Sequence, residues 1–168
     1  MPGPPGQNPQ WQRLPHLCAG TFDDAFKRIL ALECKLVLIT TGSEWPPILR
    51  QLGLPHLDVC RFFSADALGA IDRRHKTALS HDEMYFNFVD CCWDDLWRAR
   101  DAVLDLLGFD ATSSNAASGT TFILVISCQH GLHRSQAVAR SVGSCVARRG
   151  HATCVFNYAV FSRQWCVQ

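Results

Sequence analysis

Apolar residues fall into short runs along the chain that predict buried strands. The strongest run, TFILVI at residues 121–126, is apolar on both faces, as expected for a central strand of a parallel sheet. Shorter runs at residues 35–40 and 57–63 predict parallel strands that flank it, and residues 151–158 predict a closing strand. The pattern therefore favours a parallel sheet as the centre of the fold.

Stretches with helical spacing alternate with these strands. A helix is expected after Thr21, which suits an N-cap position. A second, short helix is expected to open at the prolines of residues 46–47 and to end before Gly53. Residues 84–89 are aromatic and apolar, and their pattern leaves strand and helix equally open.

Two longer helices follow. Asp94 and Asp95 suit the start of the first one, where the helix dipole favours negative charge, and Gly108 suits its end. Residues 135–149 predict the second helix, which Gly150 ends. The expected buried face of the first is Leu96, Ala99, Val103, Leu106 and Leu107. That of the second is Val138, Val142, Cys145 and Val146.

The last strand, helix and strand together form a βαβ unit. The chain has 168 residues, which fits one domain. We therefore expect a single α/β domain over residues 17–168, with a mostly parallel sheet flanked by helices. Residues 1–16 are rich in proline and glycine and are expected to be disordered.

Cysteine content bears on the cellular compartment. The chain has nine cysteines, and its first ten residues have neither a basic start nor an apolar run. We therefore expect reduced thiols in a cytoplasmic protein, with no membrane span. Cys91 and Cys92 are adjacent and no Cys-x-x-Cys occurs, so no metal site and no cofactor are expected.

Charge is unevenly distributed. Residues 80–110 are rich in acidic side chains, whereas no acidic residue follows Asp110. The final stretch carries Arg134, Arg140, Arg148, Arg149 and Arg163. A segment that has only positive side chains attracts anions, although Arg148 and Arg149 also fit a solvated helix end.

The segment between the strongest strand and the following helix combines the features of an anion site. It reads Ser-Cys-Gln-His-Gly-Leu-His-Arg-Ser over residues 127–135. Gly131 lets the backbone curl, and the first turn of a helix presents unpaired N–H groups. Arg134 adds a bidentate grip on a phosphate. The alternative is an ordinary strand-to-helix turn with Arg134 in a surface ion pair.

Cys128, Arg134 and Ser135 have the spacing Cys-x5-Arg-Ser, which resembles the signature of protein tyrosine and dual-specificity phosphatases. That resemblance implies a cysteine nucleophile, an arginine that holds the phosphoryl oxygens and a serine that stabilises the thiolate. The physics is compatible, because a helix N-terminus and an arginine lower a thiol pKa. The general acid, however, has only Asp94 or Asp95 as candidates, and both are predicted to open a helix.

The order Cys128, Gly131, His133, Arg134, Ser135, followed by Arg149-Gly150 and a final strand, more closely resembles the C-terminal domain of the RapZ (RNase adapter protein) family. Residues 58–61 resemble that family's Asp-x-Arg strand end. The resemblance implies a module that binds a phosphorylated small molecule, of which an amino sugar phosphate is one candidate. No Gly-x4-Gly-Lys-Ser/Thr occurs in the sequence, so the module is expected to be nucleotide-independent. RNA or protein contacts are a further implication, which the residues themselves do not support.

The favoured interpretation is a non-catalytic phosphate- or phosphosugar-binding module, with a cysteine-dependent phosphatase as the alternative. No catalytic residue is assigned under the first interpretation, whereas the second assigns Cys128, Arg134 and Ser135. Arg61 either reaches the site from a neighbouring strand end or pairs locally with Asp58. The expected ligand-binding residues are Cys128, Gln129, His130, Gly131, Leu132, His133, Arg134, Ser135 and Arg61.

Overall fold

The structure, a computed structural model, describes residues 34–43, 47–64, 81–108, 121–129, 131 and 133–157. The predicted disordered segment 1–16 and the helix expected after Thr21 lie outside these residues.

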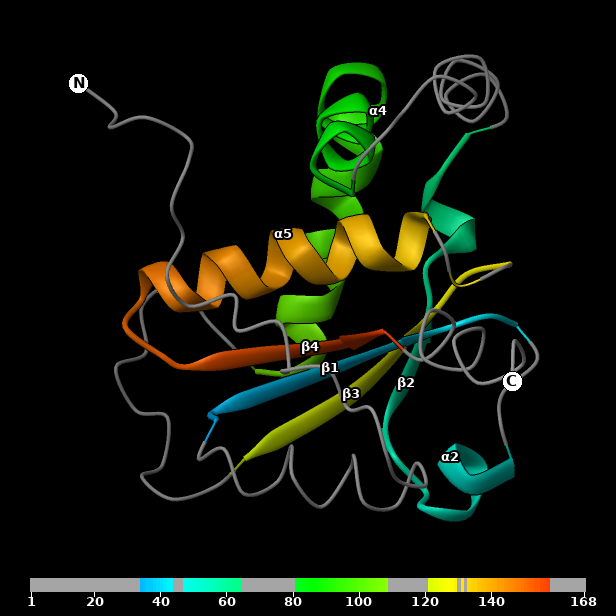
Figure 1. The fold of residues 1–168 in the computed structure, drawn as a ribbon, viewed down its shortest axis with the longest axis vertical. Coiled ribbons are helices and arrows are strands. Elements are labelled where there is room, and N and C mark those ends of the chain that lie inside the picture. Colours follow the sequence, from blue (N-terminus) through cyan, green and yellow to red (C-terminus); the bar gives the residue numbers. More distant parts are fainter. Residues whose placement is uncertain are drawn as a thin grey trace, which may run out of the picture.

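Four parallel strands form one sheet in the described part of the chain (Figure 1). They are β1 (Leu36–Thr41), β2 (His56–Asp58), β3 (Phe122–Ser127) and β4 (Thr153–Asn157), in the order β2-β3-β1-β4. The strand predicted from TFILVI is thus internal and is flanked by the two strands expected beside it. The chain is a single α/β domain with an all-parallel sheet packed against helices.

The second predicted strand is shorter than expected. Residues 57–63 were predicted to be extended, but β2 ends at Asp58 and a 3-10 helix, η1 (Cys60–Phe62), follows. The Asp58 side chain explains the break, because its Oδ1 accepts a hydrogen bond from the Cys60 backbone N–H at 2.9 Å. This local bond turns the chain out of the sheet, as aspartate side chains often do in turns.

Three helices are described: α2 (Pro47–Gln51), α4 (His81–Leu106) and α5 (Arg134–Arg148). Residues 84–89, for which strand and helix were equally open, are helical, because they lie inside α4. Helix α4 begins at His81, but the backbone of Cys92 is non-helical (φ −139°, ψ 36°) and divides it into two helical segments. Asp94 and Asp95, which were expected to open a helix, stand in the first turn of the second segment. None of the helices in the described segments combines the length and apolar character needed to cross a membrane.

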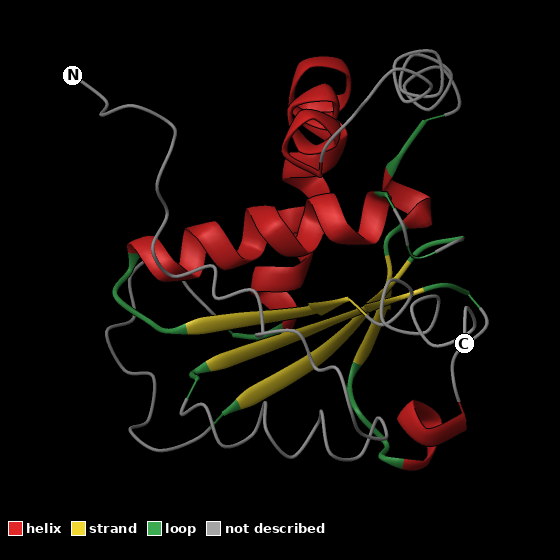
Figure 2. Ribbon diagram, in the orientation of Figure 1, coloured by secondary structure: helices red, strands yellow, loops and turns green. Residues whose placement is uncertain are grey.

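Helices α4 and α5 cover one face of the sheet, and α2 lies beyond the other (Figures 1 and 2). The core lies between the sheet and helices α4 and α5. Its fully buried members include Leu38 of β1, Leu124 of β3, Leu96 of α4 and Val138 of α5. Val142 and Val146 continue the predicted buried stripe of α5, whereas Cys145 is only half-buried.

The predicted buried face of α4 is correct at Leu96, Ala99 and Val103, which are all fully buried. It is wrong at Leu106, whose exposed fraction is 53%, and Leu104 is buried in its place. Leu106 is the last residue of the helix, and Gly108 (φ +66°) turns the chain away two residues later. The end of the helix therefore projects past the core.

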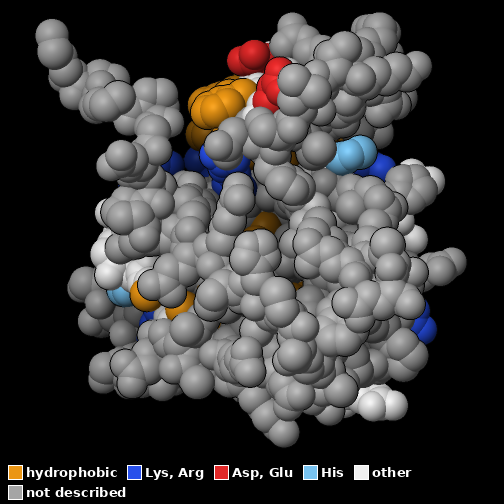
Figure 3. Space-filling model, viewed as in Figure 1, with side chains coloured by type: hydrophobic (Ala, Val, Ile, Leu, Met, Phe, Trp, Pro, Cys, Tyr) orange, Lys and Arg blue, Asp and Glu red, His pale blue; other side chains and the backbone are white. Residues whose placement is uncertain are grey.

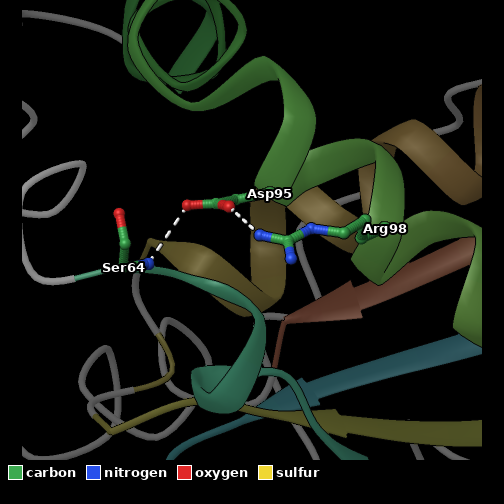
Figure 4. A network of polar contacts seen from close by, with 3 residues as sticks. All are labelled: Ser64, Asp95 and Arg98. Carbon is green, nitrogen blue, oxygen red and sulfur yellow. Dashed lines mark hydrogen bonds and ion pairs between the residues drawn. The ribbon is translucent and has the colours of Figure 1, made fainter.

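Asp95 links α4 to the segment that leaves η1. Its carboxylate accepts a hydrogen bond from the Ser64 backbone N–H at 3.1 Å and pairs with the Arg98 guanidinium one turn later (Figure 4). The Asp95 residue is 8% exposed, so the carboxylate is largely withdrawn from water. A buried carboxylate needs such partners, and this one fixes the chain after η1 against α4.

The contrast between Leu96 and Leu106 gives a matched test of the core. Both belong to α4, and Leu→Ala removes the same side-chain atoms at the two positions. We expect Leu96→Ala to lower the free energy of unfolding by about 2–5 kcal/mol, since it leaves a cavity beneath α5. Leu106→Ala is expected to change it by less than about 0.5 kcal/mol. Urea unfolding followed by circular dichroism measures both, and equal losses would contradict this arrangement.

Candidate anion-binding site

The carboxyl ends of β1, β2 and β3 are joined by hydrogen bonds. The Cys128 backbone N–H donates to the Thr41 carbonyl at 3.1 Å, and the Val59 N–H donates to the Ser127 carbonyl at 2.9 Å. Ser43 donates to the Gln129 carbonyl from both its backbone N–H (3.3 Å) and its Oγ (3.2 Å). The loop after β3 is therefore held at the edge of the sheet where ligands of parallel α/β proteins bind.

Gly131 lies directly against the backbone that follows β1. Its φ is +69°, and a Cβ placed on it would come within 2.5 Å of the Gly42 nitrogen and 2.6 Å of the Thr41 carbonyl carbon. Both the backbone conformation and the lack of space require glycine here. The sequence signal for a tight loop at this position is thus explained by contact with a second strand end.

Helix α5 begins immediately after this contact. The Ala137 N–H donates to the carbonyl of the N-cap residue His133 at 2.9 Å, and His133 makes no side-chain capping bond. No acidic residue stands in the first turn. The Gln136 side-chain amide donates to the Gly131 carbonyl at 3.3 Å, which ties the loop to the helix. The positive end of the helix dipole and its leading N–H groups thus face the end of the sheet.

Arg134 supplies a positive charge at the same place. Its guanidinium donates to Gln129 Oε1 at 3.4 Å. Within the described segments Arg134 forms no ion pair with a carboxylate. Neither Asp58 nor Asp94 pairs with Arg134. A half-buried guanidinium whose partner among the described residues is a neutral amide retains most of its capacity to bind an anion.

Cys128 and Ser135 meet beneath the loop. The Cys128 thiol donates to Ser135 Oγ at 3.3 Å, and the two residues are 3% and 0% exposed. Side chains alternate along a strand, so Cys128 continues the face of Leu124 and Ile126 that packs under α5. The sulfur therefore lies in the core side of the loop and not at its open surface.

Cys60 is a residue of this region that sequence reasoning missed. Burial, followed by a hydrogen bond to Asp58, raises the pKa of the Cys60 thiol, while the Arg134 charge and a bond from the Gln129 backbone lower it. These influences place the thiol among Asp58, Gln129 and Arg134. The available signal was its position just after β2, a strand expected to neighbour the TFILVI strand.

Thr40 contributes a second buried polar group at this end of the sheet. Its Oγ1 is fully buried and has no hydrogen-bond partner among the residues described. Thr40 is next to last in β1, and it shares a strand face with Leu36 and Leu38, which pack toward α4 and α5. A buried hydroxyl without a partner is uncommon, and it leaves hydrogen-bonding capacity close to the strand end.

Three other predicted site residues are Arg61, which contacts a neighbouring ring, and His130 and Leu132, which lie outside the described residues. The Arg61 guanidinium stands over the Phe62 ring, 4.9 Å from its centroid, and does not pair with Asp58. Across those that are described, no group of three or more His, Cys, Asp or Glu side chains is arranged to hold a metal ion.

No protein-family model matches this chain, and no characterised protein aligns with it significantly. The relationship to the RapZ family that the order of the loop residues indicates therefore remains a prediction. The geometry of the site, taken by itself, offers backbone donors, one guanidinium and a buried thiol at a helix N-terminus. That set of groups suits a phosphate or sulfate better than a neutral ligand.

Two glycines with similar backbone conformations test the contact at Gly131. Gly150 has φ +84° and nothing within 4 Å of an added Cβ, so Gly150→Ala carries only the conformational penalty, about 1–2 kcal/mol. Gly131→Ala adds a clash with backbone atoms and is expected to destabilise the fold considerably more. Urea unfolding of both variants measures the difference. Equal losses would show that the loop does not need to approach β1 so closely.

Proposed function

We propose that the chain is a binding module for the phosphoryl group of a small molecule, held by the loop from Cys128 to Ser135. The observation that carries this proposal is the closure of the loop at Gly131 onto the end of β1, directly before α5. This closure sets the first N–H groups of a 15-residue helix beside a half-buried arginine. An anion at that point interacts with both the helix dipole and a guanidinium.

The rest of the ligand is expected to be polar. Gln129 and Ser43 are exposed at the same strand ends and carry an amide and a hydroxyl. Such groups suit the hydroxyls of a sugar, which agrees with the phosphosugar that the RapZ-like residue order implies. Asp58 is also exposed near the loop and favours an amine over a second phosphate. An amino sugar phosphate therefore has hydroxyls for the amide and hydroxyl groups and an amine for the carboxylate.

Arg134→Ala tests the site, with Arg149→Ala as its control at the opposite end of α5. Loss of a charge-assisted bond is expected to weaken binding of an amino sugar phosphate by about 1.5–3 kcal/mol, or roughly tenfold to a hundredfold. Arg149 is exposed and distant from the loop, so its replacement should leave affinity unchanged. Isothermal titration calorimetry provides both values. Equal affinity of Arg134→Ala and wild type would refute the site.

A second candidate, a cysteine-dependent phosphatase, is favoured by one observation. The 3.3 Å contact between the Cys128 thiol and Ser135 Oγ is the pairing that thiolate stabilisation by a serine hydroxyl requires. The surroundings provide less support. Cys128 is only 3% exposed, and the two aspartates considered as general acids belong to α4. Asp95 is bound to Ser64 and Arg98, which leaves its carboxylate engaged in the fold.

Catalysis and binding are distinguished by turnover. As a binding module the protein is expected to hydrolyse an aryl phosphate no faster than a Cys128→Ser variant, because the Cys128 thiol is buried and Asp95 is bound to Ser64 and Arg98. Cys145→Ser, at the far end of α5, serves as the control for loss of a cysteine. Turnover that persists in Cys145→Ser and disappears in Cys128→Ser would establish the phosphatase and refute the non-catalytic module.

A further inference from the structure

A band of aromatic side chains runs along α4 beside α5, away from the loop. We call it the aromatic patch; its members are Tyr85, Phe86, Trp93 and Trp97, together with the aliphatic Val89. With Ser144 and Arg148 of α5 these residues line a surface cavity of about 340 Å³. The patch therefore combines a hollow with projecting rings.

Two members of the patch are strongly exposed for their type. Phe86 is 45% exposed and Trp93 is 48% exposed. Trp93 and Trp97 stack on each other with their ring centroids 3.7 Å apart, which makes a flat, rigid apolar surface. Large aromatic side chains rarely gather in water without a partner, and aromatic clusters of this kind are typical of protein interfaces.

The side of the patch next to α5 is positively charged. The Arg140 guanidinium lies 4.4 Å from the centroid of Tyr85 and 5.9 Å from that of Phe86. Arg148 lines the cavity and donates to the Ser144 carbonyl at 3.3 Å. Both arginines come from α5, so this helix supplies the basic flank of the patch.

The opposite side of the patch is acidic. Asp90 precedes the kink of α4, Asp94 and Asp101 follow it, and all three are exposed. Asp101 pairs with Arg100, whose guanidinium covers the Trp97 ring at 4.1 Å. Figure 3 shows the arrangement on one face of the molecule, where hydrophobic side chains lie between acidic ones above and basic ones below.

We infer that the aromatic patch is the contact surface of a homodimer, with a second copy of this chain as its occupant. A two-fold axis that lies in the patch, between its acidic and basic flanks, places the patch of one copy on that of the other and exchanges the two flanks. The acidic flank of each copy then faces the basic flank of the other.

The charge pattern separates this occupant from a nucleic acid. Stacked tryptophans and arginines suit single-stranded bases, but a phosphate backbone crossing the patch would meet the carboxylates of Asp90 and Asp94. A second copy offers both an apolar surface and the charges that both flanks require. The inference is independent of the proposed anion site, since the patch shares no residue with the loop.

The test measures self-association of the full chain by sedimentation equilibrium. Wild type is expected to show a monomer–dimer equilibrium, and Trp93→Ala is expected to raise its dissociation constant about tenfold or more. Leu52→Ala is the control, because Leu52 is similarly exposed (45%) but lies beyond α2. Circular dichroism verifies that both variants are folded.

Charge reversal tests the orientation. Arg148→Asp and Asp94→Arg are each expected to weaken self-association, because like charges then face each other across the axis. Mixed together, the two variants are expected to regain the wild-type dissociation constant as a heterodimer. A wild type that stays monomeric at all concentrations, a dimer that Trp93→Ala leaves unchanged, or a mixture without recovery would overturn the inference, and so would binding of a single-stranded RNA by a monomer.

Discussion

The close approach of two backbones at the end of the sheet determines the geometry of the site. Gly131 lies against Thr41 and Gly42 with no space for a side chain, so the loop after β3 cannot move away from β1 without losing this contact. Helix α5 starts three residues later, and its direction across the sheet is therefore set by the same contact. The position of Arg134 and the meeting of Cys128 with Ser135 both follow from it.

Burial has different consequences for the polar groups of this region. Ser135 and Cys128 satisfy each other, which makes their burial inexpensive. Thr40 has no described partner, although leaving a buried hydroxyl unpaired costs on the order of 1–3 kcal/mol. Asp95, by contrast, is buried on α4 with two partners that belong to the fold. The unsatisfied group thus lies at the strand ends, and the satisfied carboxylate lies in the scaffold that supports them.

Periodicity predicted the elements whose burial is uniform. Leu124, Val125 and Ile126 of the run TFILVI are buried on both faces, so the apolar pattern identified an internal strand. Val138, Val142 and Val146 repeat with the turns of α5. Elements shaped by one side-chain bond or by a neighbour were not predictable in this way. A single bond from Asp58 ends β2, and the kink at Cys92 has no proline or glycine to announce it. Cys60 joins the site only through pairing of strands distant in sequence.

The absence of acidic residues from the start of α5 connects the charge pattern of the sequence to the site. Helices commonly carry aspartate or glutamate in the first turn, or a capping side chain, because either one stabilises the positive end of the dipole. The first turn of α5 has no acidic residue, and His133 provides no capping bond. The carboxylates are concentrated instead on α4, where they flank the aromatic patch. An external anion at the loop would supply the missing negative charge, and its binding free energy would add to the stability of the helix.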